Sequence, residues 1–136
     1  MAQSTEQRNR YKGTPPRPWI VARIASPDGN VCELNLLADT GNPFAIVVAE
    51  KFESEWSFGG GRDVETNFGV LQAAWFHLAM PELGLDRMII GYISDNVMTS
   101  AQASHPDFDG LAGLPLLRLL EYGGDADAFW IRKPAS

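Results

Sequence analysis

The residues best suited to chemistry in this chain are an aspartate, a threonine and a glycine in direct succession, Asp39-Thr40-Gly41. They follow Leu36-Leu37-Ala38, an apolar run typical of a buried strand. A strand holds an aspartate on a rigid base, and glycine lets a second backbone segment approach closely. The threonine hydroxyl can both donate and accept hydrogen bonds. Because all three residue types favour turns, the tripeptide alone is also consistent with an ordinary turn.

A second segment, Leu111-Ala112-Gly113, changes the weight of the first. Gly113 comes 72 residues after Gly41 (113 − 41) and leads into an apolar stretch over residues 114–122. Two apolar residues and a glycine are what a strand needs to pass tightly beside an aspartate loop. Alone, this segment is also consistent with the start of a helix that has a hydrophobic face. The two segments together are more specific than either one.

The pair resembles the active-site segments of the retropepsin-like aspartic proteases, the single-domain, retroviral type. The resemblance in layout runs from about Trp19 to Arg132, and the identity of residues is confined to the two motifs. It implies an all-β fold, a closed acid-protease barrel with one short C-terminal helix. It also implies that Asp39 is the catalytic carboxylate and that Thr40 holds two loops together across a dimer axis. Gly41 would permit their close approach, and the site would be backed by Leu111, Ala112 and Gly113.

The mechanism of this family needs two carboxylates that share one proton, because two like charges so close together do not both ionise readily. The chain has 136 residues and a single Asp-Thr-Gly, too few for two lobes. The resemblance therefore implies a homodimer that cleaves a peptide or protein substrate without a cofactor. The residue after the glycine is usually Ala or Ser in this family, whereas here it is Asn42, and Ala38 is small for its place. These departures leave an alternative open, a non-catalytic dimerisation or peptide-binding module.

Short strands must position these residues. A β-rich run, Trp19–Ala25, is followed by a turn sequence and a second strand over residues 31–37, which together form a hairpin. Further strands are expected over 44–48, 70–80, 88–93 and 128–132, with a helical turn over 50–56. Residues 94–109 are polar and predict a surface loop, whereas Pro115 and Gly123 bracket a short helix over 114–122. This order favours a small barrel or sandwich.

A hairpin between the two motifs is the candidate flap over a substrate. Its first strand covers residues 62–66, and its tip is predicted at Thr66, Asn67, Phe68 and Gly69. Gly69 would supply the positive φ of a tight turn. The run Gly59-Gly60-Gly61 competes for this role, as a hinge or as a plain flexible loop.

Composition narrows the class of partner. The net charge of −6 and the pI of about 4.8 argue against nucleic acid or an anionic membrane surface. With Cys32 alone there is no internal disulfide, and His77 and His105 lack further ligands at a spacing that would bind a metal. Residues 1–18 are polar and predict a disordered or loosely ordered arm before one domain over 19–136. Without a signal-peptide pattern or a membrane span, the default expectation is cytoplasmic.

Overall fold

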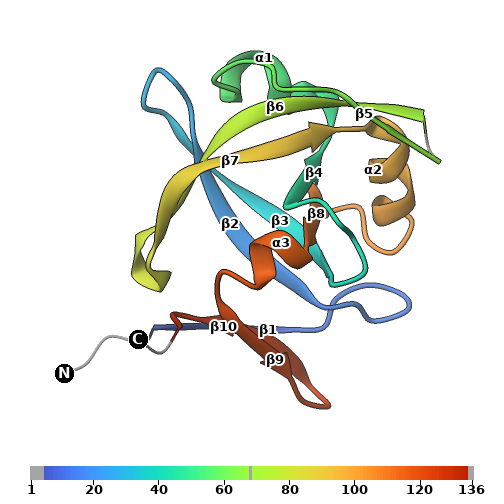
Figure 1. The fold of residues 1–136 in the computed structure, drawn as a ribbon. Helices are drawn as coiled ribbons and strands as arrows, with labels where there is room; N and C mark the ends of the chain where they lie inside the picture. Colours follow the sequence, from blue (N-terminus) through green and yellow to red (C-terminus); the bar gives the residue numbers. More distant parts are fainter. Residues whose placement is uncertain (1–4, 68, 135–136) are drawn as a thin grey trace.

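The computed structural model describes residues 5–67 and 69–134, and most of them lie in strands (Figure 1). The strands are β1 (Glu6–Arg10), β2 (Trp19–Ala25), β3 (Val31–Asp39), β4 (Ile46–Val48), β5 (Val64–Thr66), β6 (Gly69–Met80), β7 (Leu85–Ile93), β8 (Gly110–Gly113), β9 (Glu121–Gly124) and β10 (Ala128–Arg132). The helices are the α-helices α1 (Glu53–Trp56), α2 (Asp95–Gln102) and α3 (Leu114–Leu117) and the 3-10 helices η1 (Glu50–Phe52) and η2 (Pro81–Leu83). None of the described helices is long and apolar enough to cross a membrane.

Six strands close into a barrel in the order β2-β3-β8-β4-β7-β6, with β6 pairing back onto β2 and β5 extending from β6. The prediction of an all-β barrel is therefore confirmed. Alternate side chains fill the barrel interior: on β2, Ile20, Ala22 and Ile24 are fully buried, whereas the residues between them are partly exposed. Leu34 and Leu36 of β3 continue this interior surface.

A second apolar cluster lies outside the barrel, under α2. It comprises Leu37, Val47, Met98, Ala101, Phe108 and Leu111. On β3, Leu36 and Ala38 belong to the main core, whereas Leu37 points to the opposite face and joins this second cluster. The run Leu36-Leu37-Ala38 is thus buried on both faces, which explains why it is apolar throughout. Burying a leucine side chain contributes about 1.5–3 kcal/mol.

The expected arm over residues 1–18 is ordered where the structure describes it, so this part of the prediction was wrong. Its strand β1 pairs antiparallel with β10, from Glu6↔Arg132 to Arg10↔Ala128, in a small sheet of order β1-β10-β9 outside the barrel (Figure 1). One polar side chain of the arm binds the backbone of β2. Gln7 Nε2 donates to Val21 O (2.9 Å), and Val21 N donates to Gln7 Oε1 (2.7 Å).

Two other expectations are corrected. The predicted loop over residues 94–109 contains α2, whose N-cap Ser94 accepts a hydrogen bond from Val97 N at 3.2 Å. The predicted helix over 114–122 ends at Leu117, and the chain then forms β9, which pairs with β10 through Gly123 and Gly124. The apolar side chains of this stretch still enter the core, because Leu116, Leu117 and Leu120 are buried.

The predicted hairpin between the motifs is present. β5 pairs with β6 up to Thr66↔Gly69, Thr66 Oγ1 donates to Gly69 O at 2.9 Å, and Gly69 has a φ of +98°. Of the four residues predicted for its tip, Phe68 lies outside the described residues, and Asn67 is exposed. The role of this hairpin as a flap stays a prediction.

Candidate active site

Asp39 ends β3 beside Gly113, the last residue of β8. The two strands run parallel, with Leu37 opposite Leu111, Ala38 opposite Ala112 and Asp39 opposite Gly113. β8 also pairs with β4, antiparallel, so it lies between the strands that precede and follow the aspartate loop. The structure thus brings together the two sequence segments, as predicted, although 74 residues separate Asp39 from Gly113 (113 − 39).

The aspartate loop is tied to the end of β8 by backbone hydrogen bonds. Gly113 N donates to Ala45 O at 2.9 Å, and Leu114 N donates to Asn42 O at 3.0 Å. At Gly113 a Cβ atom would lie 1.9 Å from Phe44 O and 2.7 Å from Asn42 O. Because backbone atoms make both contacts, a side chain could be fitted only by moving the loop away. Glycine is therefore required here for close approach rather than for its conformational range.

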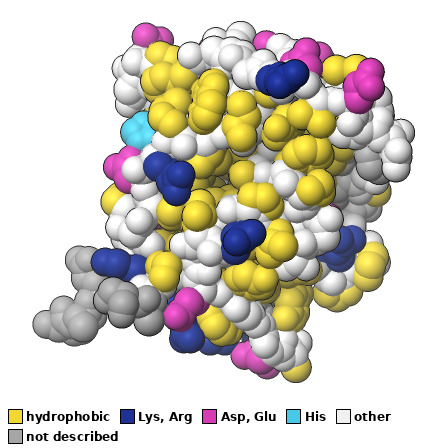
Figure 2. All heavy atoms as spheres, viewed as in Figure 1, with side chains coloured by type: hydrophobic (Ala, Val, Ile, Leu, Met, Phe, Trp, Pro, Cys, Tyr) yellow, Lys and Arg dark blue, Asp and Glu magenta, His cyan; other side chains and the backbone are white. Residues whose placement is uncertain are grey.

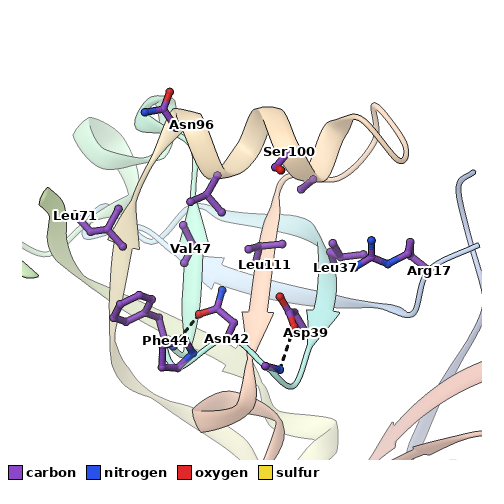
Figure 3. A pocket seen from close by; sticks show the side chains of 14 residues that line it. Arg17, Leu37, Asp39, Asn42, Phe44, Val47, Leu71, Asn96, Ser100 and Leu111 are labelled. Atoms are coloured by element: carbon purple, nitrogen blue, oxygen red, sulfur yellow. Dashed lines mark hydrogen bonds between the residues drawn. The ribbon is translucent and has the colours of Figure 1, made fainter. Parts of the chain in front are cut away.

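The carboxylate of Asp39 is partly exposed and receives one hydrogen bond within the described chain, from Gly41 N to Oδ1 at 3.0 Å. Its other oxygen is open to a ligand. Thr40 and Gly41 are both exposed. Asn42, whose size departs from the family pattern, turns away from the aspartate: its Oδ1 accepts a hydrogen bond from Phe44 N at 2.9 Å (Figure 3). It stabilises the loop and makes no hydrogen bond to the Asp39 carboxylate.

A cavity of about 350 Å³ opens beside Asp39 (Figure 3). Its floor is a row of three apolar side chains from adjacent strands, Leu37, Leu111 and Val47, held opposite one another by the strand register. Asp39 stands two residues beyond Leu37 and therefore on the same face of β3. The volume lies near the lower end of the roughly 300–1,000 Å³ typical of ligand pockets. The site joins a partly exposed carboxylate to a cavity with an apolar floor.

Several lining residues were missed by the sequence analysis. The cavity wall opposite the strand floor is α2, which contributes Asn96, Val97, Ser100 and Ala101, and Arg17 stands at one end. A signal for α2 was present: Ser94 is a good N-cap, and Val97, Met98 and Ala101 are spaced as one face of a helix. No comparable signal singled out Arg17 from the other basic residues near it.

The remaining sequence candidates lie elsewhere. Leu71 of β6 lines the cavity, but none of the described tip residues Thr66, Asn67 and Gly69 does so in this single chain. His77 pairs with Asp86, and His105 Nδ1 lies 3.7 Å from Asp107 Oδ2. Among the described residues no group of three or more His, Cys, Asp or Glu side chains could hold a metal ion.

Comparison of the chain with models of protein families, with curated proteins and with solved structures gave no match.

Proposed function

We propose that this chain is an aspartic endopeptidase of the retropepsin-like type, active as a homodimer in which each copy contributes Asp39. One observation carries the proposal. Asp39, at the end of β3, lies beside Gly113, where the aspartate loop leaves no room for a Cβ atom, and one oxygen of its carboxylate has no hydrogen-bond partner among the described residues. This carboxylate lies at the edge of the cavity. An ordinary turn needs neither the close contact of the aspartate loop with Gly113 nor the cavity. The same residues in an isolated Asp-Thr-Gly turn would not explain why Gly113 has no room for a Cβ atom.

The chemistry assigned to the pair is hydrolysis by an activated water. One carboxylate removes a proton from water while the oxygen of that water attacks the carbonyl carbon of the scissile peptide bond. The second carboxyl, protonated, donates its hydrogen to the carbonyl oxygen, which gives a tetrahedral diol. Proton transfer to the peptide nitrogen then lets the C–N bond break and releases an amine and a carboxylic acid. These roles belong to the coupled pair rather than to either copy.

The second carboxylate must come from another copy of the chain, because the sequence holds one Asp-Thr-Gly. Thr40, next to Asp39, supports this arrangement, since its exposed side chain makes no hydrogen bond to other described residues. A hydroxyl left free beside the site is available to bind the equivalent loop of a partner. A two-fold axis through the two loops would place both aspartates together.

A second candidate, a non-catalytic peptide-binding module, is favoured by the use of Asn42. Its amide stabilises the Phe44 turn and leaves the Asp39 carboxylate with one backbone donor. Such a module would keep the cavity and bind peptides without cleaving them.

Incubation with a peptide library from pH 4 to pH 7.5, followed by mass spectrometry of the products, tests the proposal. Wild-type protein should cleave, and Asp39→Asn should not. Asp28→Asn is the matched control, because Asp28 is an exposed aspartate in the turn between β2 and β3. Cleavage that survives in Asp39→Asn would refute the assignment, and peptide binding without cleavage at any pH would favour the second candidate.

Sedimentation tests the dimer separately. Wild-type protein should associate in a concentration-dependent way, and Thr40→Ala should weaken that association and the activity together. A wild-type protein that is active yet strictly monomeric at high concentration would contradict the paired-aspartate mechanism.

A further inference from the structure

Two segments outside the expected barrel meet at the cavity beside Asp39. The loop between β1 and β2 is closed by a pair of backbone bonds, Lys12 N to Arg17 O (3.0 Å) and Arg17 N to Lys12 O (2.8 Å). This loop docks on the chain that follows α2, where Thr14 N donates to Ser104 O at 3.1 Å. At Gly13 a Cβ atom would lie 2.8 Å from the same carbonyl oxygen, so the contact is close. The backbone of Arg17 is thus held at a defined place against the α2 segment.

The side chain of Arg17 is the one cation among the described residues that line this cavity. It extends from its loop toward Leu37, at one end of the apolar row (Figure 3). Two other basic residues of the same segment have acidic partners: Arg8 binds Glu6 and Asp125, and Lys12 Nζ lies 3.8 Å from Asp107 Oδ2. Arg10 does not line the cavity. Arg17 makes no ion pair with any described residue. Its guanidinium is therefore free to bind a carboxylate that the protein does not itself supply.

The positive charge of Arg17 contrasts with the negative net charge of the chain. With a net charge of −6, the chain as a whole repels acidic peptides. An unpaired arginine at one end of the apolar row reverses that preference locally, because a guanidinium can bind a carboxylate with two parallel hydrogen bonds. The neighbouring surface of Leu37 and Leu111 suits the methylene groups of a side chain rather than a free anion.

We propose that the corner formed by Arg17 and α2 is a specificity site that accepts an acidic side chain of the substrate peptide, glutamate in preference to glutamine. The methylenes of the glutamate lie on Leu37 and Leu111, and its carboxylate binds Arg17. Ser100, whose side chain points from α2 toward Leu111, offers a hydroxyl on the opposite wall (Figure 3). This inference rests on the proposed function, in that the cavity is taken to be the place where a peptide binds beside Asp39.

The experiment compares peptides within each protein variant, so that a loss of stability cancels. A peptide library first identifies the position at which wild-type protein prefers an acidic residue. Two peptides are then made that differ only by Glu or Gln at that position, and kcat/KM is measured for both at pH 6.5. Wild-type protein should prefer the Glu peptide by about tenfold, which corresponds to about 1.4 kcal/mol. Arg17→Ala should bring the ratio close to one, and Arg17→Glu should reverse it.

Arg87→Glu is the matched control. Arg87 is exposed on β7 and does not line the cavity. Its replacement by glutamate changes the net charge by the same amount as Arg17→Glu does. The wild-type preference should persist in this variant. It should also fade below about pH 4, where the substrate glutamate takes up a proton.

A binding measurement separates the two proposals. Fluorescence polarisation of labelled Glu and Gln peptides on Asp39→Asn protein reports the specificity site without requiring turnover. If peptides are not cleaved but the Arg17-dependent binding preference is present, the endopeptidase proposal fails and the specificity site stands. If Asp39-dependent cleavage occurs but wild-type protein shows no acidic preference, or Arg17→Glu and Arg87→Glu change the ratio equally, the specificity site is refuted and the endopeptidase stands.

Discussion

Replacing Gly113 by alanine is the sharpest test of the site geometry. The added Cβ would stand 1.9 Å from Phe44 O, 2.7 Å from Asn42 O and 3.0 Å from Phe44 C. All three are backbone atoms, so no rotamer change relieves the clash and the aspartate loop must move away from β8. That movement strains the hydrogen bonds from Gly113 N to Ala45 O and from Leu114 N to Asn42 O.

The cost follows from two contributions. Overpacking of a well-packed site costs about 1–3 kcal/mol, and each strained hydrogen bond adds about 0.5–1.5 kcal/mol if it is lost. We expect a loss of about 3 kcal/mol in the free energy of unfolding. For a domain of this size that corresponds to a fall in Tm of about 10 °C. Activity should fall further than the folded fraction, because the loop that moves carries Asp39.

Gly60→Ala is the control for this substitution. The nearest atom to a Cβ at Gly60 is Ala73 O at 3.8 Å, an ordinary van der Waals contact. The free energy of unfolding should then change by no more than about 0.5 kcal/mol. Thermal unfolding followed by circular dichroism compares the two variants with wild type. If Gly113→Ala is no less stable than Gly60→Ala, the aspartate loop does not lie as close to β8 as described, and close approach does not explain the glycine at position 113.

Three further predictions concern other parts of the molecule. Gln7→Ala removes both side-chain hydrogen bonds to the Val21 backbone and should lower the free energy of unfolding by about 1–3 kcal/mol. Urea unfolding measures this loss, with Gln72→Ala as the control because Gln72 is exposed. Backbone N–H groups of Asp127 and Ala128, with Arg8, hold the pKa of Asp125 below its usual value, so its contribution to stability is present at neutral pH and lost as pH falls through that lowered pKa. Asp125→Asn should therefore lower Tm at pH 7 and match wild type near pH 2; a constant difference would contradict this. Burial, and to a lesser degree the charge of Asp109, raises the pKa of the Cys32 thiol, so a disulfide reagent at pH 8 should react slowly with Cys32 and faster in Asp109→Asn; an unchanged rate would exclude the charge effect.

The barrel and the contact of Asp39 with Gly113 were predictable because both require particular residue types at particular positions in the sequence. The strand β2 was predictable from its run of residues that favour strands, Trp19–Ala25. Burial on both faces made the run before Asp39 apolar throughout. Residue 113 is a glycine because a Cβ atom at this position would lie 1.9 Å from Phe44 O.

The strand β1 and the helix α2 have weaker signals in the local sequence. Glu6–Arg10 is polar, and its order comes from backbone pairing with β10, more than 110 residues later in the chain, which no local pattern encodes. α2 is eight residues long, so its spacing of apolar residues repeats too few times to stand out from a polar loop containing Pro106. The stretch over 114–122 is rich in leucine and suggested one helix. Pairing of Gly123 and Gly124 with β10 instead ends the helix early.

Two of the features that the sequence analysis missed, α2 and Arg17, border the cavity beside Asp39. The physical reason is that chemistry demands particular residues at particular places, whereas a cavity wall demands only size and polarity. Many sequences satisfy the second demand, so the wall leaves no motif. Under the proposed function, the aspartate loop and β8 would determine whether a peptide bond can be cleaved, and the wall would determine which peptide is bound. Substitutions at Asp39 should consequently abolish turnover while peptide choice, measured by binding, is preserved. Substitutions at Arg17 should change peptide choice while the dependence of turnover on Asp39 is preserved. A variant of Arg17 that removed the Asp39 dependence itself would show that the two parts of the site are not separable in this way.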